Sequence, residues 1–177
     1  MLNQNQSKGF LAVVGCALAG FLFAGSANAL NPEPVVAEVE WVAPVTITET
    51  NALQFGLLDV NMLNAQTVVI NTDSSYLDAN GNVAGGAKAA AALTVGAEAG
   101  RTIDILVDTI IPNTGYTLIN FVCNYNTVGP DTACSGASYP ETAVASATLL
   151  VGATLQGDGA AVAGAANGSF NVTITYQ

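Results

Sequence analysis

The sequence contains no histidine and little charge of either sign. Charged residues occupy 9% of its 177 positions, whereas an ordinary soluble domain has about 25%. Without histidine the chain cannot build a His general base or a His-ligated zinc or haem site. It has 3 basic side chains against 13 acidic ones, a formal net charge of −10. This argues against binding nucleic acid or an anionic membrane, because both need Lys and Arg to neutralise phosphates. We therefore expect that the protein is not an enzyme and that it holds no cofactor and no metal.

The chain also lacks the roughly 20 consecutive apolar residues of a membrane-spanning helix. Its longest apolar run, residues 10–24, follows a polar start that contains Lys8 and precedes a stretch of small residues. This order predicts a secretory signal peptide over residues 1–29, with Ala27 and Ala29 as its cleavage site. We therefore expect an exported mature chain with no integral membrane span.

Cysteine is scarce, with three residues in all. Cys16 lies in the signal segment, where the preceding residues loosely fit a lipoprotein box, and lipidation of Cys16 stays open as an alternative. Cys123 and Cys134 remain in the mature chain, and an isolated pair in an exported chain predicts one disulfide. Closing a loop of about a dozen residues would stabilise the fold by roughly 2.5–3 kcal/mol. A metal or redox pair would need C-x-x-C spacing or further soft ligands, which the sequence does not offer.

Removing 29 residues from 177 leaves 148, enough for one domain with its own core. Apolar and polar residues alternate with a period of two between turn residues, a pattern typical of strands. We expect strands near residues 35–42, 45–50, 66–71, 91–95, 102–110, 117–125, 143–156 and 169–176. The one stretch with helical character, residues 87–92, is short and flanked by glycine. Seven or eight short strands predict an all-β, immunoglobulin-like two-sheet sandwich.

The start of the mature chain has one apolar face. Every second residue there is apolar, in the series Val35, Ala37, Val39, Trp41, Ala43, Val45 and Ile47. The segment is either a first strand packed in its own core or a donor strand that fills a groove of the next subunit. Pro44 cannot donate a ladder hydrogen bond, so it divides an extension over residues 30–44 from a body over residues 45–177.

The last twenty residues carry a resemblance. A small-residue stretch over residues 157–168 precedes an alternating strand whose apolar positions are Phe170, Val172, Ile174 and Tyr176. With tyrosine next to last, this segment resembles the end of chaperone–usher pilins. The resemblance implies an incomplete immunoglobulin-like domain whose C-terminal strand binds a periplasmic chaperone. It also implies that a neighbour's N-terminal extension replaces the chaperone, with the donor face of residues 35–43 entering a groove beside the last strand.

The middle of the chain departs from those pilins, whose disulfide joins early strands. It is similar instead to a family of uncharacterised, secreted, pilin-like Gram-negative domains. The motifs that carry this likeness are Val42-Ala43-Pro44-Val45-Thr46-Ile47, Leu53-Gln54-Phe55-Gly56, Asp78-Ala79-Asn80-Gly81-Asn82 and the closing strand from Gly168 to Tyr176. The resemblance implies export to the periplasm, the cell surface or beyond.

Two smaller groups of acidic residues could suggest chemistry. Residues 78–82 resemble the start of a calcium loop but lack its bidentate Glu, and Asn80-Gly81 is a hairpin signal in its own right. Asp104 and Asp108 share one face of a strand at a spacing of ~13 Å, too far apart for paired acid–base work. We expect a turn and a solvated outer face, respectively.

These observations favour a non-catalytic subunit of a surface fibre or pilus-like polymer that assembles by strand donation with itself or with sister subunits. The alternative is a self-contained secreted adhesin or matrix-binding module, with its N-terminal strand in its own sheet.

Overall fold

The computed structural model describes residues 36–111, 113–127 and 129–177. Ala27 and Ala29 of the predicted cleavage site, Cys16, and Val35 of the extension lie outside these ranges. The chain divides into two units, Met1–Glu40 and Trp41–Gln177, and the strands of the described ranges all belong to the second. Within the described ranges, no helix is long and apolar enough to cross a membrane.

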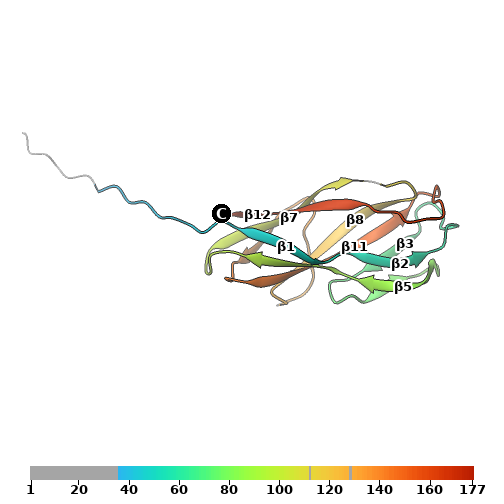
Figure 1. Cartoon of the computed structure of the whole chain (residues 1–177), viewed down its shortest axis with the longest axis horizontal. Helices are drawn as coiled ribbons and strands as arrows, with labels where there is room; N and C mark the ends of the chain where they lie inside the picture. The colour runs from blue at the N-terminus through green and yellow to red at the C-terminus, as the bar shows by residue number, and fades with distance from the viewer. Residues whose placement is uncertain (1–35, 112, 128) are drawn as a thin grey trace, which may run out of the picture. The chain divides into compact units, whose positions relative to one another are not determined.

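The described chain is all-β, as the sequence predicts (Figure 1). Its strands are β1 (Thr46–Asn51), β2 (Gln54–Leu58), β3 (Thr67–Ile70), β4 (Tyr76–Asp78), β5 (Val83–Ala89), β6 (Ala91–Gly96), β7 (Thr102–Ile111), β8 (Tyr116–Tyr125), β9 (Thr132–Ala133), β10 (Tyr139–Thr142), β11 (Ala147–Gly157) and β12 (Ser169–Tyr176).

The largest sheet is built around the long strand β11. One edge of β11 pairs with β8 over almost its whole length. The other edge pairs first with β6 and then with β3. Beyond these neighbours, β1 pairs with β6, β4 with β3, and β9 with β8, all antiparallel.

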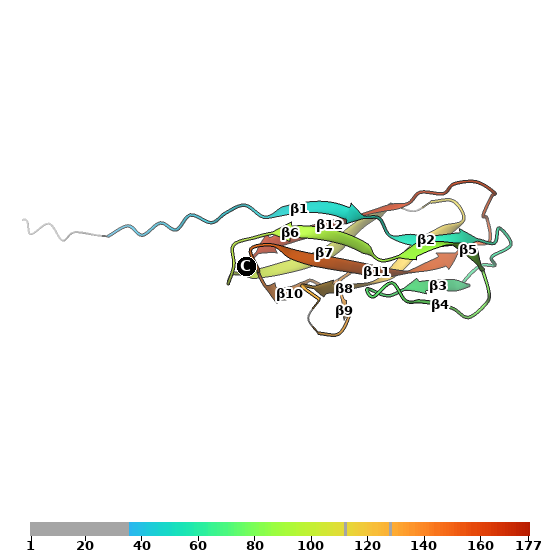
Figure 2. The same cartoon turned by 60° about the horizontal axis from the view of Figure 1, so that its bottom comes forward.

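A second sheet has the order β10-β7-β12, and β2 with β5 forms a third, two-stranded one (Figure 2). The two larger sheets share one core. Ile103, Ile105 and Val107 of β7 are at most 2% exposed, as are Leu149 and Val151 of β11, and all five belong to the same apolar cluster. This arrangement is sandwich-like.

Most of the expected strands are present, and the last is found at its predicted bounds. The sequence argues against a helix at residues 87–92, and this is confirmed, because β5 ends at Ala89 and β6 begins at Ala91. The described part of the expected first strand, residues 36–42, has no regular structure. The short strands β2, β4, β5, β9 and β10 were not expected. In β5, Gly85 and Gly86 lie within the strand with positive φ angles.

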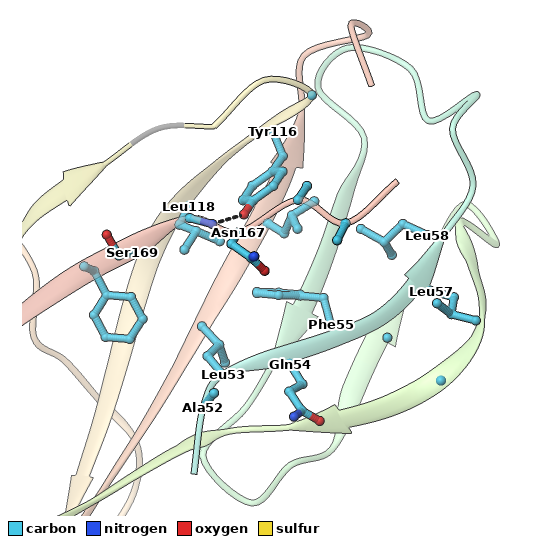
Figure 3. Close-up of a pocket in the computed structure, with 18 of the residues that line it drawn as sticks. Ala52, Leu53, Gln54, Phe55, Leu57, Leu58, Tyr116, Leu118, Asn167 and Ser169 are labelled. Carbon is cyan, nitrogen blue, oxygen red and sulfur yellow. Dashed lines mark hydrogen bonds between the residues drawn. The ribbon is translucent and has the colours of Figure 1, made fainter. Parts of the chain in front are cut away.

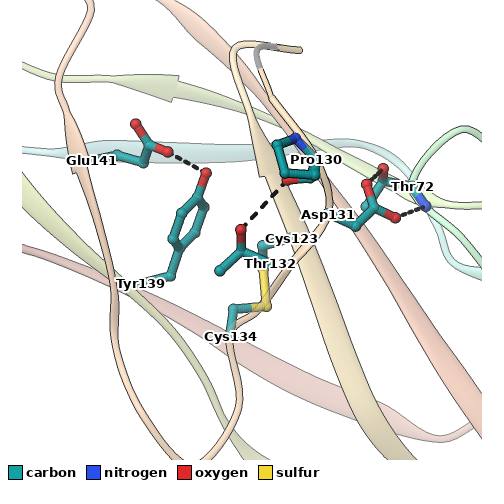
Figure 4. The surroundings of a disulfide bond; sticks show 8 residues. All are labelled: Thr72, Cys123, Pro130, Asp131, Thr132, Cys134, Tyr139 and Glu141. Atoms are coloured by element: carbon teal, nitrogen blue, oxygen red, sulfur yellow. Dashed lines mark hydrogen bonds between the residues drawn. A yellow bond between two sulfur atoms is a disulfide. The ribbon is translucent and has the colours of Figure 1, made fainter.

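Cys123 and Cys134 form a disulfide, as the sequence predicts, and both are fully buried (Figure 4). Cys123 lies in β8, and Cys134 follows β9 in the segment that crosses to the second sheet. The Cys134 amide donates to the carbonyl of Phe121, and the Cys134 carbonyl accepts from the amide of Val107 in β7. The disulfide therefore reinforces a crossing point between the two larger sheets.

Candidate functional site

β12 lies at the edge of its sheet. It pairs with β7 on one side, and no other strand of the described residues pairs with it on the other side. β1 likewise lies at an edge of the largest sheet. A strand edge without a partner exposes main-chain N–H and C=O groups that can bind a further strand.

A groove with both apolar and polar lining lies beside the first half of β12. Its volume is about 1170 Å³, and it runs between β2 on one side and residues 161–173 on the other. The side chains that give it its apolar character are Leu53, Phe55, Leu58, Leu93, Leu118, Leu155, Phe170 and Val172. Figure 3 shows Phe55 and Leu118 among the side chains around this space. These side chains suit the apolar side chains of an occupant, while polar residues of the same lining, such as Gln54 and Asn167, offer hydrogen-bonding groups.

The predicted C-terminal strand alternates in burial. Ile174 is buried, and Phe170, Val172 and Tyr176 are partly buried against the core, whereas the residues between them are exposed. The Phe170 ring contacts the ring of Phe121 at a centroid distance of 4.9 Å. All four predicted residues thus share the inner face of β12, and the first two also line the groove.

The segment before β12 is fastened at both ends. Gly115 donates to the Asp158 carboxylate over 3.1 Å, and the Asp158 amide donates back to the Gly115 carbonyl over 3.2 Å. At the other end the Gly168 amide donates to the Tyr116 hydroxyl over 2.6 Å, as Figure 3 shows. The small residues between these anchors form one wall of the groove.

The predicted donor face carries uncovered apolar side chains. Trp41 is 89% exposed and Val39 is 72% exposed, and Ala37 and Ala43 are exposed too. Residues 36–45 pair with no strand of the described chain. Trp41, which belongs to the same unit as the groove, therefore has no apolar cover there.

The extension joins the body at a group of three residues that we call the Ala43 clasp: Ala43, Glu98 and Tyr176. The Ala43 amide donates to Glu98 Oε2 over 3.3 Å. The Ala43 carbonyl accepts from the Tyr176 hydroxyl over 2.9 Å, and that hydroxyl accepts from the Glu98 amide over 2.7 Å. Arg101 Nε lies 3.6 Å from Glu98 Oε1. Sequence reasoning missed Glu98, because nothing in the local pattern marks a residue 55 positions from its partner.

The acidic turn at residues 78–82 is internally satisfied. Asp78 accepts from the Val83 amide over 2.7 Å and from Asn82 Nδ2 over 3.3 Å. Desolvation raises the pKa of Asp78, but the backbone hydrogen bonds led by Val83 outweigh it, and the net pKa lies below the usual aspartate value. The turn predicted here is present, although β4 and β5 on its two sides pair with other strands rather than as a hairpin.

The second acidic pair, Asp104 and Asp108, lies on the face of β7 opposite its buried residues, and both residues are half-buried rather than fully solvated. Asp104 accepts from the Gln177 side chain over 2.7 Å, and Asp108 accepts from the Thr173 hydroxyl over 3.0 Å. Among the described residues, no group of three or more His, Cys, Asp or Glu side chains could hold a metal ion.

Residues 45–176 match the family described as a domain of unknown function, DUF4402. The matched range covers the body that begins after Pro44. Neither a curated protein nor a solved structure matches the chain significantly.

Proposed function

The chain belongs to the DUF4402 family, a domain of unknown function, and we propose that it is a non-catalytic, exported structural subunit that assembles into a surface fibre by strand donation. One observation carries the proposal: the same chain has a groove with a row of apolar side chains beside an unpaired strand edge, and an extension whose apolar side chains Val39 and Trp41 are exposed. Each feature supplies what the other lacks.

The lengths and side-chain patterns of the two parts agree. β12 has 8 residues, and residues 36–43 provide a described extension of the same length. In a strand, successive side chains point to opposite faces. A donated extension that turns Val39 and Trp41 into the groove therefore leaves Glu38 and Glu40 in water. Burying two aliphatic or aromatic side chains would stabilise the complex by roughly 3–6 kcal/mol, and each ladder hydrogen bond would add about 0.5–1.5 kcal/mol.

In this proposal the domain is an immunoglobulin-like sandwich without one strand. β12 ends one larger sheet and β1 ends the other, so a strand added beside β12 would close an open side of the sandwich. Strand addition of this kind gives affinity through main-chain hydrogen bonds and selectivity through alternate side chains. The net negative charge then disfavours indiscriminate pairing between exposed edges.

Deletion of residues 31–43 from the purified mature protein tests the proposal. The mature protein should form fibres visible by electron microscopy, and its assembly should depend on concentration in size-exclusion chromatography. The deleted form should remain monomeric and should bind a synthetic peptide of residues 31–44. Polymer formation that persists after the deletion would refute strand donation. A mature protein that is monomeric at every concentration would fit the self-contained binding module instead.

A further inference from the structure

Both backbone groups of Ala43 are held by the body. Its N–H donates to the Glu98 carboxylate and its C=O accepts from the Tyr176 hydroxyl. The Tyr176 hydroxyl is itself fixed by the Glu98 amide. These three hydrogen bonds set the direction in which the chain enters the body at this point.

Pro44 adds a restriction from the other side. Its ring fixes its own φ near −65°, and its Cδ pushes the preceding residue, Ala43, into extended conformations. With Ala43 restricted to extended conformations and its N–H and C=O held by the body, fewer backbone conformations are available for a tight reversal at this point. The clasp and Pro44 therefore oppose the same movement, a sharp turn at residues 43–44.

The extension would need that turn in order to fill the groove of its own chain, an arrangement that we call self-closure. Tyr176 is the last residue of β12, whereas the groove lies beside the first half of that strand. An extension that starts at Tyr176 would have to run back along β12 toward Ser169, parallel to it. Residues 36–43 are long enough to do so, because they match the length of β12. Length alone therefore does not keep the extension out of its own groove.

Self-closure would compete strongly with assembly. A segment tethered by a short linker meets its own binding site at an effective concentration in the millimolar range. At micromolar protein concentrations, an unrestrained extension would therefore fill its own groove before it met a neighbour. On the premise that the proposed function is correct, we infer that the Ala43 clasp and Pro44 keep the extension out of its own groove and direct it to a second copy of the chain. Tyr176 and Glu98 are positioning residues in this scheme.

Trp41 is the sole tryptophan of the chain and reports directly on this competition. In the unaltered mature protein, dilution should separate the subunits and shift the Trp41 fluorescence to the red as the ring returns to water. In Tyr176→Phe and in Pro44→Gly, the emission should stay blue at every dilution while chromatography shows a monomer. In Tyr176→Phe the concentration at which half the protein assembles should rise by about tenfold, the effect of losing one or two hydrogen bonds, and in Pro44→Gly it should rise as well.

Tyr125→Phe is the matched control. Its hydroxyl accepts from the Val144 amide over 3.1 Å, so the substitution removes a similar tyrosine–backbone hydrogen bond outside the clasp. It should follow the dilution curve of the unaltered protein. Near-ultraviolet circular dichroism shows whether each variant is folded. If Tyr176→Phe is unfolded, Pro44→Gly tests the proposal instead, because Pro44 is exposed.

The outcomes separate the two claims. An unaltered protein that never assembles refutes strand donation itself. An unaltered protein that assembles, with clasp variants that assemble equally well and expose Trp41 on dilution, refutes the clasp and leaves strand donation standing.

Discussion

The hydroxyl of Tyr176 donates a 2.9 Å hydrogen bond to the carbonyl oxygen of Ala43, 133 positions earlier in the sequence. The contact joins the end of the last strand to the point where the N-terminal extension begins, as the nearby C-terminus and β1 in Figure 1 illustrate. Because Phe170 and Val172 of the same strand line the groove, one strand contacts both the root of the extension and the site that we propose for a neighbour's extension.

Replacing both Cys123 and Cys134 by alanine should lower the free energy of unfolding. The bridge closes a loop with a sequence separation of 11 residues, and its removal should cost about 3 kcal/mol because the unfolded chain gains freedom. Urea unfolding monitored by circular dichroism measures this loss. The unaltered protein in reductant should lose a similar amount, and an unchanged stability in both cases would contradict the prediction.

Gly56→Ala should destabilise the pairing of β2 with β5. Gly56 has φ +83°, and a Cβ at this position would collide with the Gly85 carbonyl oxygen. Gly81 has a similar φ of +72° but open space around it, so Gly81→Ala isolates the cost of the backbone conformation alone, about 1 kcal/mol. Thermal unfolding should show a clearly larger loss for Gly56→Ala, by a further 1–3 kcal/mol on the order of other overpacked sites. Equal losses would mean that β2 and β5 are not in close contact.

Asp78→Asn should lower stability at neutral pH and have less effect in acid. Desolvation raises the pKa of Asp78, but the backbone hydrogen bonds lower it more, so the folded pKa lies below its usual value. Such a carboxyl group contributes stability above its unfolded pKa, and this contribution is lost as the pH falls through the folded pKa. Urea unfolding of both proteins between about pH 7 and about pH 3 spans that window. A stability difference that does not change with pH would contradict the prediction.

The strands that were predictable alternate without interruption. In β12, inner residues such as Val172 and Ile174 alternate with exposed threonines, and its bounds follow directly. β2 and β5 were missed because their pairing shifts register twice, between Phe55 and Leu57 and again before Leu58. A bulged strand with positive-φ glycines loses the period-two signal on which sequence reading depends.

The groove and the clasp could not be predicted from local sequence patterns, for a different reason. The likeness at residues 53–56 singled out Leu53 and Phe55, but only the packing of distant segments makes them the lining of a groove. In the clasp, Glu98 lies 55 positions from Ala43 and 78 from Tyr176. Hydrogen bonds between residues this far apart depend on the topology of the whole domain, which no single segment encodes.

Trp41→Ala should weaken assembly more than any change on the opposite face of the extension. The side chain is 89% exposed in the single chain, so its removal costs the isolated fold almost nothing, whereas in the assembled form it would fill the groove. Loss of a buried aromatic anchor at an interface typically costs at least 2 kcal/mol, which corresponds to a shift of about 30-fold in the concentration at half assembly. Glu38→Ala is the matched control, because Glu38 lies on the other face of the same segment and is exposed as well. Analytical ultracentrifugation over a concentration series compares the two variants. Because the isolated fold of both variants should unfold at the same temperature, a difference in assembly between them reports on the intermolecular contact, and equal assembly would remove Trp41 from the proposed donor face.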